Sequence, residues 1–376
     1  MNRIPALDML RGYALVAIML NHMPAGVLRQ FTLTNYTIFD AAELFVLLSG
    51  FLVGLVWLKT HESEGLGAAQ WRFARRAVQV WLALIAGAVL IALLSGALTA
   101  LDLKHTAVWT GYGGWLAENP LGYLGVVASL WMQPNLVDVL ALYVVLMASV
   151  PLLVPLLERR PLVFALLSLA VWMAAVPLNA ALPNERHGGG LLFNPFGWQV
   201  LFYAGVAMGL FRRSAMPVLR RWSGAVTVLA LGVALYGTAM AVLWRFGPEG
   251  KRLADVLWHA VGKVDKWSLD EMRLAAVLAW AWLVAVPLAA PMAWLSGTAA
   301  GRALAVVGRG GLVTFVACVL LSILGDAMAT NPAGTDTAWK VTVDLLVVAL
   351  LWLIGLGWLH RARIGAALVA KVQTSG

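Results

Sequence analysis

Hydrophobic residues in this chain form long, nearly continuous stretches rather than alternating with polar ones. About 20 apolar residues are enough to cross a bilayer core as a helix, and a helix satisfies its backbone polar groups within the span. The pattern therefore predicts an all-α, polytopic membrane protein of about ten transmembrane helices. They are expected near residues 8–28, 38–58, 77–100, 136–157, 161–182, 197–212, 223–245, 273–294, 303–325 and 341–360. The stretch 120–133 could add a short or re-entrant segment.

The polar segments between these spans differ in charge. With the N-terminus in the cytoplasm, the inside segments hold most of the basic residues and few acids. The larger outside loops, 101–135, 183–196 and 246–272, contain many of the acids. Because Lys and Arg are enriched in cytoplasmic loops, we predict that both termini face the cytoplasm. No Pro- or Ser-rich linker divides the chain, so we predict a single integral-membrane domain over residues 1–376.

Composition supports this interpretation, since 61% of residues are hydrophobic and 12% are charged, proportions that argue against a soluble domain. The net charge of +9 follows from the basic cytoplasmic loops, and we expect no nucleic-acid partner. Cys318 is the only cysteine and lies in an apolar run, so we expect a small buried side chain rather than a disulfide or a thiol-rich metal site. No cleavable signal peptide is evident before the first span.

Ionisable residues inside predicted spans are the first candidates for function, because they are costly to place there. Arg11 and His22 are eleven residues apart, which places them within about 20° of the same helix face and about 16 Å apart along it. Asp40 and Glu43, three residues apart, share a face of the second span. Asp40 is expected at a depth similar to that of His22, and Glu43 about one turn deeper. A histidine beside two carboxylates is a plausible general base.

Structural alternatives exist for each of these residues. Arg11 could extend its guanidinium to the inner headgroups, and His22, Asp40 and Glu43 could form an ion pair that only joins two helices. We expect no metal site there, because no second histidine or cysteine occurs at ligand spacing.

A second basic group lies in WRFARRAVQVW, at the cytoplasmic start of the third span, where Arg72, Arg75 and Arg76 are close together. These arginines could mark topology alone. Together with Arg11 they could also bind a cytosolic polyanion such as the phosphates of coenzyme A.

Several blocks of this sequence resemble a known family. Arg11 and His22, followed by NHMP and FDAAELFVLLSGF, resemble the start of the acyltransferase-3 superfamily and, within it, the OpgC-type succinyltransferases of osmoregulated periplasmic glucans. Further blocks follow in the family's order: WMQPNLVDVLALYVVL, NPFGWQVLFYAG, DKWSLDEMRLAAVLA and GRGGLVTFVACVLLSILG. The resemblance covers about residues 3 to 325.

The resemblance implies a multi-pass enzyme of the bacterial inner membrane with the transmembrane acyltransferase fold. It would use acyl-CoA, most plausibly succinyl-CoA, as a co-substrate rather than a permanently bound cofactor, and would acylate a hydroxyl of a periplasmic glucan. His22 would be the base, assisted by Asp40 and Glu43, while Arg11, Arg72, Arg75 and Arg76 would hold CoA. A homo-oligomer is compatible with this assignment.

The same resemblance suggests residues on the acceptor side or near the thioester oxygen, where an amide donor could stabilise a developing oxyanion. They are Gln133, Asn135, Asp138, Asn194, Trp198, Gln199, Lys266 and Arg273. Helix capping or interhelical hydrogen bonding is the alternative for each amide.

One position departs from the family pattern, and a different function is also conceivable. Where relatives carry a histidine after the DKxxL block, this chain has Ala276, which puts the usual acyl group or acceptor in doubt. The alternative function is a proton-coupled transporter or an exporter of an anionic or acylated saccharide.

Overall fold

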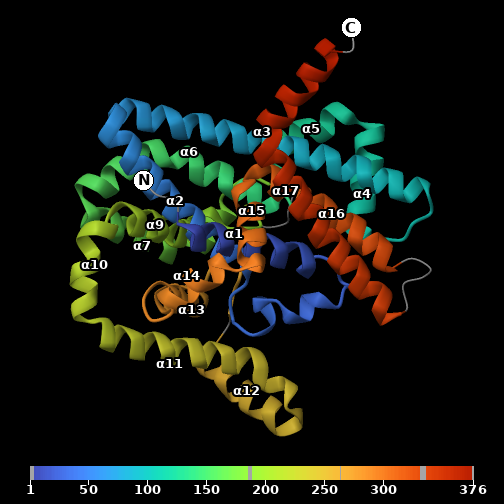
Figure 1. Cartoon of the computed structure of the whole chain (residues 1–376). Coiled ribbons are helices and arrows are strands. Elements are labelled where there is room, and N and C mark those ends of the chain that lie inside the picture. The colour runs from blue at the N-terminus through green and yellow to red at the C-terminus, as the bar shows by residue number, and fades with distance from the viewer. Residues whose placement is uncertain (1–3, 185–188, 263, 331–335, 375–376) are drawn as a thin grey trace. The chain divides into compact units, whose positions relative to one another are not determined.

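The computed structural model describes residues 4–184, 189–262, 264–330 and 336–374, and every regular element in these ranges is helical (Figure 1). The chain divides into two compact units. The first comprises Met1–Gln30, Leu94–Ala107 and Ala290–Gly376, and the second comprises Phe31–Leu93 and Val108–Ala289.

The first unit contains helices from both ends of the chain: α1 (Pro5–Asn21), α15 (Ala299–Arg309), α16 (Leu312–Thr330) and α17 (Thr337–Thr374). Helix α1 packs against α15 and α16, and α17 packs against α15 and α16. Gly12 on α1 and Gly308 on α15 lie at the α1–α15 contact, where a Cβ on either would overlap the backbone of the other helix. Cys318 is fully buried in this unit, as predicted.

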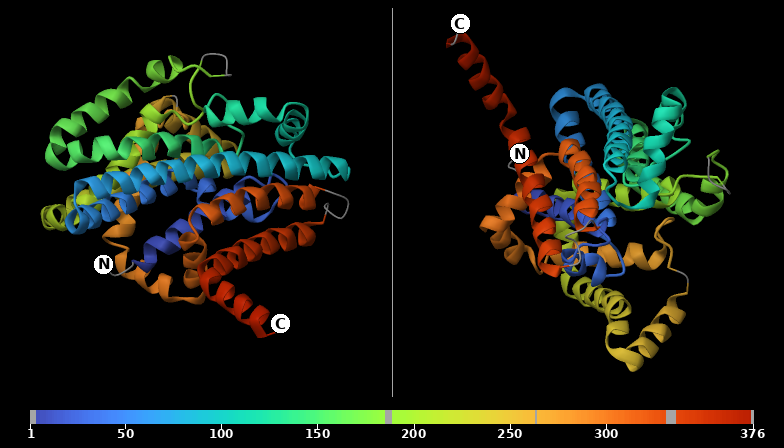
Figure 2. Two further views of the ribbon diagram at one scale, coloured as in Figure 1. Left: turned by 90° about the horizontal axis from the view of Figure 1, so that it is seen from above. Right: turned by 90° about the vertical axis from the view of Figure 1, so that its right-hand side faces the viewer.

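The second unit is built around α2 and α9, which lie side by side (Figure 2). Its elements are η2 (Leu33–Asn35), α2 (Ala41–Glu64), α4 (Ala107–Glu118), α5 (Pro120–Ala128), α6 (Asp138–Arg159), α7 (Pro161–Met173), α8 (Ala175–Ala180), α9 (Pro195–Leu210), α10 (Arg212–Arg221), α11 (Ser223–Val242), η3 (Leu243–Arg245), α12 (Gly247–Val261) and α13 (Glu271–Ala285). Four elements cross or adjoin the boundary between the units: η1 (Leu28–Phe31), α3 (Leu66–Ala100), α4, whose first residue Ala107 belongs to the first unit, and α14 (Ala289–Gly297).

Close approach of α2 and α9 depends on glycines. Gly50 and Gly54 on α2 meet Gly205 and Gly209 on α9, and a Cβ at any of the four would overlap a carbonyl oxygen of the opposite helix. Small residues at four-residue spacing let transmembrane helices pack backbone to backbone, where dispersion contacts are most numerous. This paired motif fixes the helix that carries Glu43 against the helix that begins next to Asn194.

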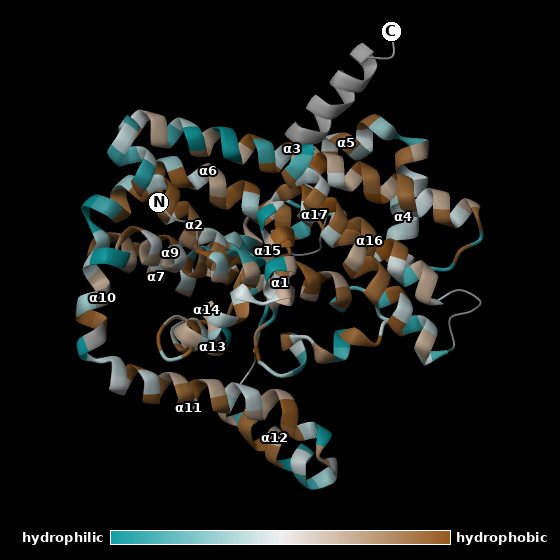
Figure 3. Cartoon of the chain, viewed as in Figure 1, coloured by the Kyte–Doolittle hydropathy of each residue, from teal (hydrophilic) through white to brown (hydrophobic). Residues whose placement is uncertain are grey.

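Six helices in the described ranges are long and apolar enough to span a membrane, and each overlaps a predicted span. They are Ala41–Glu64, Leu66–Ala100, Asp138–Arg159, Ser223–Arg245, Leu312–Thr330 and Thr337–Arg361. Figure 3 shows α16 and much of α11 coloured as hydrophobic. On α11, the apolar side chains of Val228, Leu229 and Leu235 are exposed, as a lipid-facing helix requires.

The predicted span 273–294 corresponds to a pair of helices, α13 and α14, which are bent by 73° at a break that contains Pro287. Proline lacks the N–H that would continue the helix. The remaining three predicted spans correspond to shorter helices, including α1 with 17 residues and α9 with 16. The count of ten spans and the cytoplasmic termini therefore stay predictions.

Three predicted boundaries are wrong, for local reasons. Helix α1 ends at Asn21 rather than near residue 28, because Pro24 disfavours helical backbone at the residue before it. The span 303–325 is not one helix, since Gly311 adopts φ 64° between α15 and α16. The span 161–182 is interrupted at Ala174, because Pro177 has no N–H to bond the carbonyl four residues before it.

Candidate functional site

The start of α2 brings two carboxylates together. Asp40 is the N-cap residue, and its Oδ1 accepts a hydrogen bond from the backbone N of Ala42 at 2.8 Å. The Glu43 carboxylate in turn accepts from the backbone N of Asp40 at 3.1 Å. This is a capping box, in which the spacing of three residues satisfies the first unpaired N–H groups of the helix.

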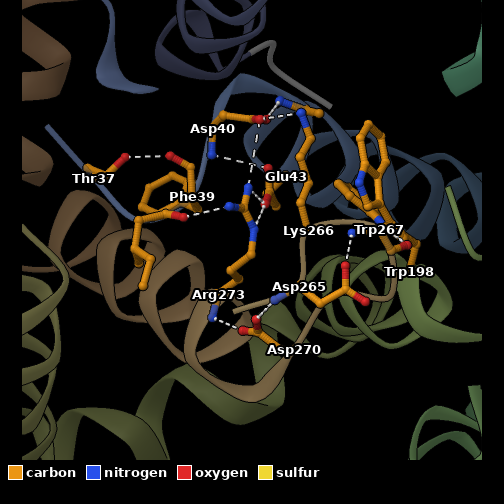
Figure 4. A network of polar contacts seen from close by, with 12 residues as sticks. Thr37, Phe39, Asp40, Glu43, Trp198, Asp265, Lys266, Trp267, Asp270 and Arg273 are labelled. Carbon is orange, nitrogen blue, oxygen red and sulfur yellow. Dashed lines mark hydrogen bonds and ion pairs between the residues drawn. The ribbon is translucent and has the colours of Figure 1, made fainter. Parts of the chain in front are cut away.

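Two basic side chains face these carboxylates: Lys266, which precedes α13, and Arg273, which lies in its first turn (Figure 4). Lys266 Nζ lies 2.6 Å from Asp40 Oδ2. Arg273 Nε donates to Glu43 Oε1 at 2.6 Å, and Arg273 Nη2 also contacts that oxygen. Arg273 Nη1 donates to the Ile38 carbonyl at 2.8 Å. We call Asp40, Glu43, Lys266 and Arg273 the ion cluster.

Burial makes the ion cluster energetically important. The Glu43 side chain has no exposed surface, and only 11% of the Arg273 side chain is exposed. The formal charges of the two acids and two bases cancel. Removing one partner would leave a buried charge uncompensated, which is much costlier than losing an exposed pair. Burial alone would lower the pKa of Lys266, but the attraction and hydrogen bond of Asp40 together with the attraction of Glu43 outweigh burial and raise that pKa, so Lys266 is an ammonium at neutral pH.

A network of hydrogen bonds fixes the segment that carries Lys266. The Trp267 carbonyl accepts from Asn194 N and from Trp198 Nε1, both at 3.0 Å. Asp270 caps α13 by accepting from Arg273 N at 2.8 Å. Asn194 also caps α9, since its Oδ1 accepts from the backbone of that helix. The predicted residues Asn194 and Trp198 therefore support the ion cluster through Trp267.

Three of the other predicted acceptor-side residues make structural contacts within the second unit. Gln199 accepts from Ser168 Oγ at 2.7 Å and so links α9 to α7. Asn135 Oδ1 accepts from Trp109 Nε1 at 3.1 Å, and Asp138 accepts from the backbone N of Val139 at 2.8 Å. The Gln199 bond matches the alternative of interhelical bonding, whereas Asn135 joins the turn before α6 to α4.

Gln133 is closer to the support of the ion cluster. Its Oε1 accepts from Leu192 N at 3.1 Å, and its Nε2 donates to the Leu130 carbonyl at 2.7 Å. Leu192 lies two residues before Asn194, so Gln133 helps to hold the segment that leads into α9.

His22 belongs to the first unit and caps the C-terminal end of α1. Its Nδ1 lies 2.7 Å from the carbonyl oxygen of Ile18. A carbonyl oxygen can only accept, so Nδ1 carries the proton in this contact and the basic lone pair of the neutral ring is on Nε2. The backbone of α1 thereby orients His22 as a general base requires.

Asp344 on α17 is a residue to which the sequence pattern assigned no role in the site. It is fully buried, and its Oδ2 accepts from the backbone N of Val27 and of Leu28, both at 2.8 Å. It therefore ties down the chain that follows His22. Its signal in the sequence is an acid within a predicted span, which is a functional or structural marker by default.

The predicted CoA-binding arginines occur in both units. Arg11 is half-buried on α1. Arg72 and Arg75 are exposed on α3, whereas Arg76 is half-buried and donates to Gln79 Oε1 at 3.2 Å. The structure thus brings together Asp40, Glu43, Lys266 and Arg273. The joint action of His22 with Asp40 and Glu43, and of Arg11 with the α3 arginines, stays a prediction because these residues belong to different units.

A family model with the description "OpgC protein" matches residues 3–362, nearly the whole chain. This match supports the family and leaves the wider acyltransferase-3 placement as an expectation. No curated protein and no solved structure matches the chain.

Proposed function

The chain belongs to the OpgC family, and from this premise we propose that it transfers a succinyl group from cytosolic succinyl-CoA to a hydroxyl of a periplasmic glucan. Family membership indicates a membrane acyltransferase that acts on periplasmic glucans. The six apolar helices indicate a multi-pass membrane protein. The succinyl group, the CoA donor, the inner-membrane location and the cytoplasmic termini are parts of the proposal.

The orientation of His22 is the observation that carries the mechanism. With Nδ1–H bonded to the Ile18 carbonyl, Nε2 is the atom that accepts a proton. In the proposed step, Nε2 removes the proton from a glucan hydroxyl as its oxygen attacks the thioester carbonyl carbon. The C–S bond then breaks, and the CoA thiolate leaves and takes up the proton from the imidazolium. The products are an ester on the glucan and CoA–SH, and His22 is regenerated.

In this proposal, binding of CoA and assistance of the base use different residues. Arg11, Arg72, Arg75 and Arg76 bind the CoA phosphates, for which planar guanidinium groups are well suited. Assistance of His22 by Asp40 and Glu43 is retained as a proposal, with the Asp40→Asn variant as its test: unchanged turnover in that variant would remove Asp40 from the mechanism.

The experiment compares two histidines with the same local geometry. His259 lies on α12, is exposed, and has its Nδ1 2.6 Å from the Asp255 carbonyl, four residues earlier, just as His22 contacts Ile18. Purified protein in liposomes receives labelled succinyl-CoA and unacylated glucan, and both acylated glucan and free CoA are measured. We expect His22→Ala to abolish transfer with CoA affinity retained, and His259→Ala to behave as the unaltered protein.

Two results would contradict the proposal. Substantial turnover by His22→Ala would remove the general-base assignment. Movement of an anionic solute across the vesicle membrane without consumption of thioester would favour the transporter alternative.

A further inference from the structure

The segment that supplies Lys266 to the ion cluster also presents an indole to solvent. Trp267 is 42% exposed, although its backbone carbonyl is bound by both Asn194 and Trp198. The Lys266 side chain is 33% exposed. A rigid backbone therefore holds a large aromatic side chain at the surface beside a charged group. We call Phe193, Lys266 and Trp267 the aromatic ledge.

The geometry of the aromatic ledge is well defined. Phe193 packs edge-on against Trp267, with ring centroids 5.4 Å apart and planes at 75°. Lys266 Nζ lies 5.4 Å from the Trp267 ring centroid and 5.8 Å from that of Phe193. Phe193 also packs against the buried Trp198. The orientation of the Trp267 ring is thus fixed before any ligand arrives, which lowers the entropy lost on binding.

Tryptophan at a membrane edge is often only an anchor, so Trp267 is best compared with two other exposed tryptophans of this unit. Trp244 and Trp258 are exposed, and their indole N–H groups donate to the carbonyls of Ala241 and Met240. Among the described residues, no atom accepts a hydrogen bond from the indole N–H of Trp267. Trp267 also differs from them in its position, because it lies next to the ion cluster, as Figure 4 shows.

A sugar ring is the ligand that matches these features. The C–H face of a pyranose is flat and apolar and packs on an aromatic face, while its hydroxyls accept and donate hydrogen bonds around the rim. Lys266 Nζ has three N–H donors, and Asp40 takes one direction at 2.6 Å. The indole N–H supplies a further donor. The aromatic ledge therefore offers an aromatic surface together with two polar donors, the Lys266 ammonium over the Trp267 ring and the indole N–H at the ring edge.

We propose that the aromatic ledge is the glucan-binding subsite, in which one sugar residue stacks on Trp267 and places a hydroxyl next to Lys266. This inference rests on the proposed function, because it names how the acceptor of that reaction is held. Lys266 then links the bound glucan to Asp40, and through Asp40 to the start of α2.

The test measures glucan binding separately from transfer. Unacylated periplasmic glucan, purified from cells that lack the protein, is titrated calorimetrically into the purified full-length protein without acyl-CoA. The variants are Trp267→Leu, which removes the aromatic face, Trp267→Phe, which keeps one, and Trp258→Leu as the control at an exposed anchor. We expect Trp267→Leu to weaken binding by roughly tenfold, an effect typical of losing one aromatic stacking contact.

We expect Trp267→Phe to retain most of the affinity and Trp258→Leu to bind as the unaltered protein does. The Michaelis constant for glucan should rise in parallel in Trp267→Leu, with the constant for acyl-CoA unchanged. Unchanged glucan affinity in Trp267→Leu, in protein that still transfers acyl groups, would overturn the subsite and leave the proposed function standing. Glucan binding that depends on Trp267 without any acyl transfer would overturn the proposed function and leave the subsite standing.

Discussion

Arg273 provides the sharpest test of the ion cluster. The variant Arg273→Met keeps a long apolar side chain and removes the guanidinium, with its bonds to Glu43 and to the Ile38 carbonyl. The Glu43 side chain has no exposed surface, so water cannot replace the lost partner. Breaking a buried pair in this way typically costs about 3–5 kcal/mol of unfolding free energy, against about 0–1 kcal/mol for an exposed pair.

The assay is SDS titration of the purified protein in mixed micelles, followed by tryptophan fluorescence and circular dichroism. The unfolding free energy of Arg273→Lys should fall between those of the unaltered protein and Arg273→Met, because one ammonium cannot bond Glu43 and Ile38 as a planar guanidinium does. The double variant Glu43→Gln/Arg273→Met should be more stable than Arg273→Met alone, since it removes the uncompensated carboxylate. A loss below about 1 kcal/mol of unfolding free energy in Arg273→Met would refute the buried-pair argument, because a loss of that size is typical of a solvent-exposed pair.

Three further predictions concern other parts of the molecule. Gly205→Ala should destabilise the protein by about 1–3 kcal/mol, because the new Cβ overlaps backbone of α2; in the same SDS titration Gly232→Ala, where a Cβ meets no atom within 4 Å, should cause no loss. Asp344→Ala should cost about 1–3 kcal/mol by leaving the partly buried backbone N–H groups of Val27 and Leu28 without their acceptor, and equal stability would show that the chain after His22 is held by other contacts. Replacing Arg75 and Arg76 together with glutamine should weaken CoA binding measured by calorimetry, and unchanged affinity would return both to a topological role.

The sequence pattern predicted the helical membrane class and the position of six spans, because long apolar stretches have few other solutions. It failed at boundaries set by single residues. Pro24 ends α1 early, and Gly311 divides the ninth predicted span. Hydropathy averages over such positions, whereas backbone geometry depends on each of them.

For the site, residue type and spacing identified Asp40 and Glu43, and the family resemblance identified Lys266 and Arg273. Their pairing was not predicted, because Glu43 and Arg273 are 230 residues apart and nothing local in either segment indicates the other. The capping box at Asp40 and Glu43 was missed for a different reason. The same three-residue spacing that places two acids on one helix face is also the spacing by which a helix start is capped.

The long separation within the ion cluster has a consequence for synthesis of the protein. At about 5–20 residues per second, the ribosome needs roughly 10–45 s after Glu43 to reach Arg273. During that interval the nascent chain holds an acidic side chain in its second helix without the guanidinium that will neutralise it. Insertion of the early helices must therefore tolerate an unmatched acid, and any chain that terminates before residue 273 carries that defect permanently.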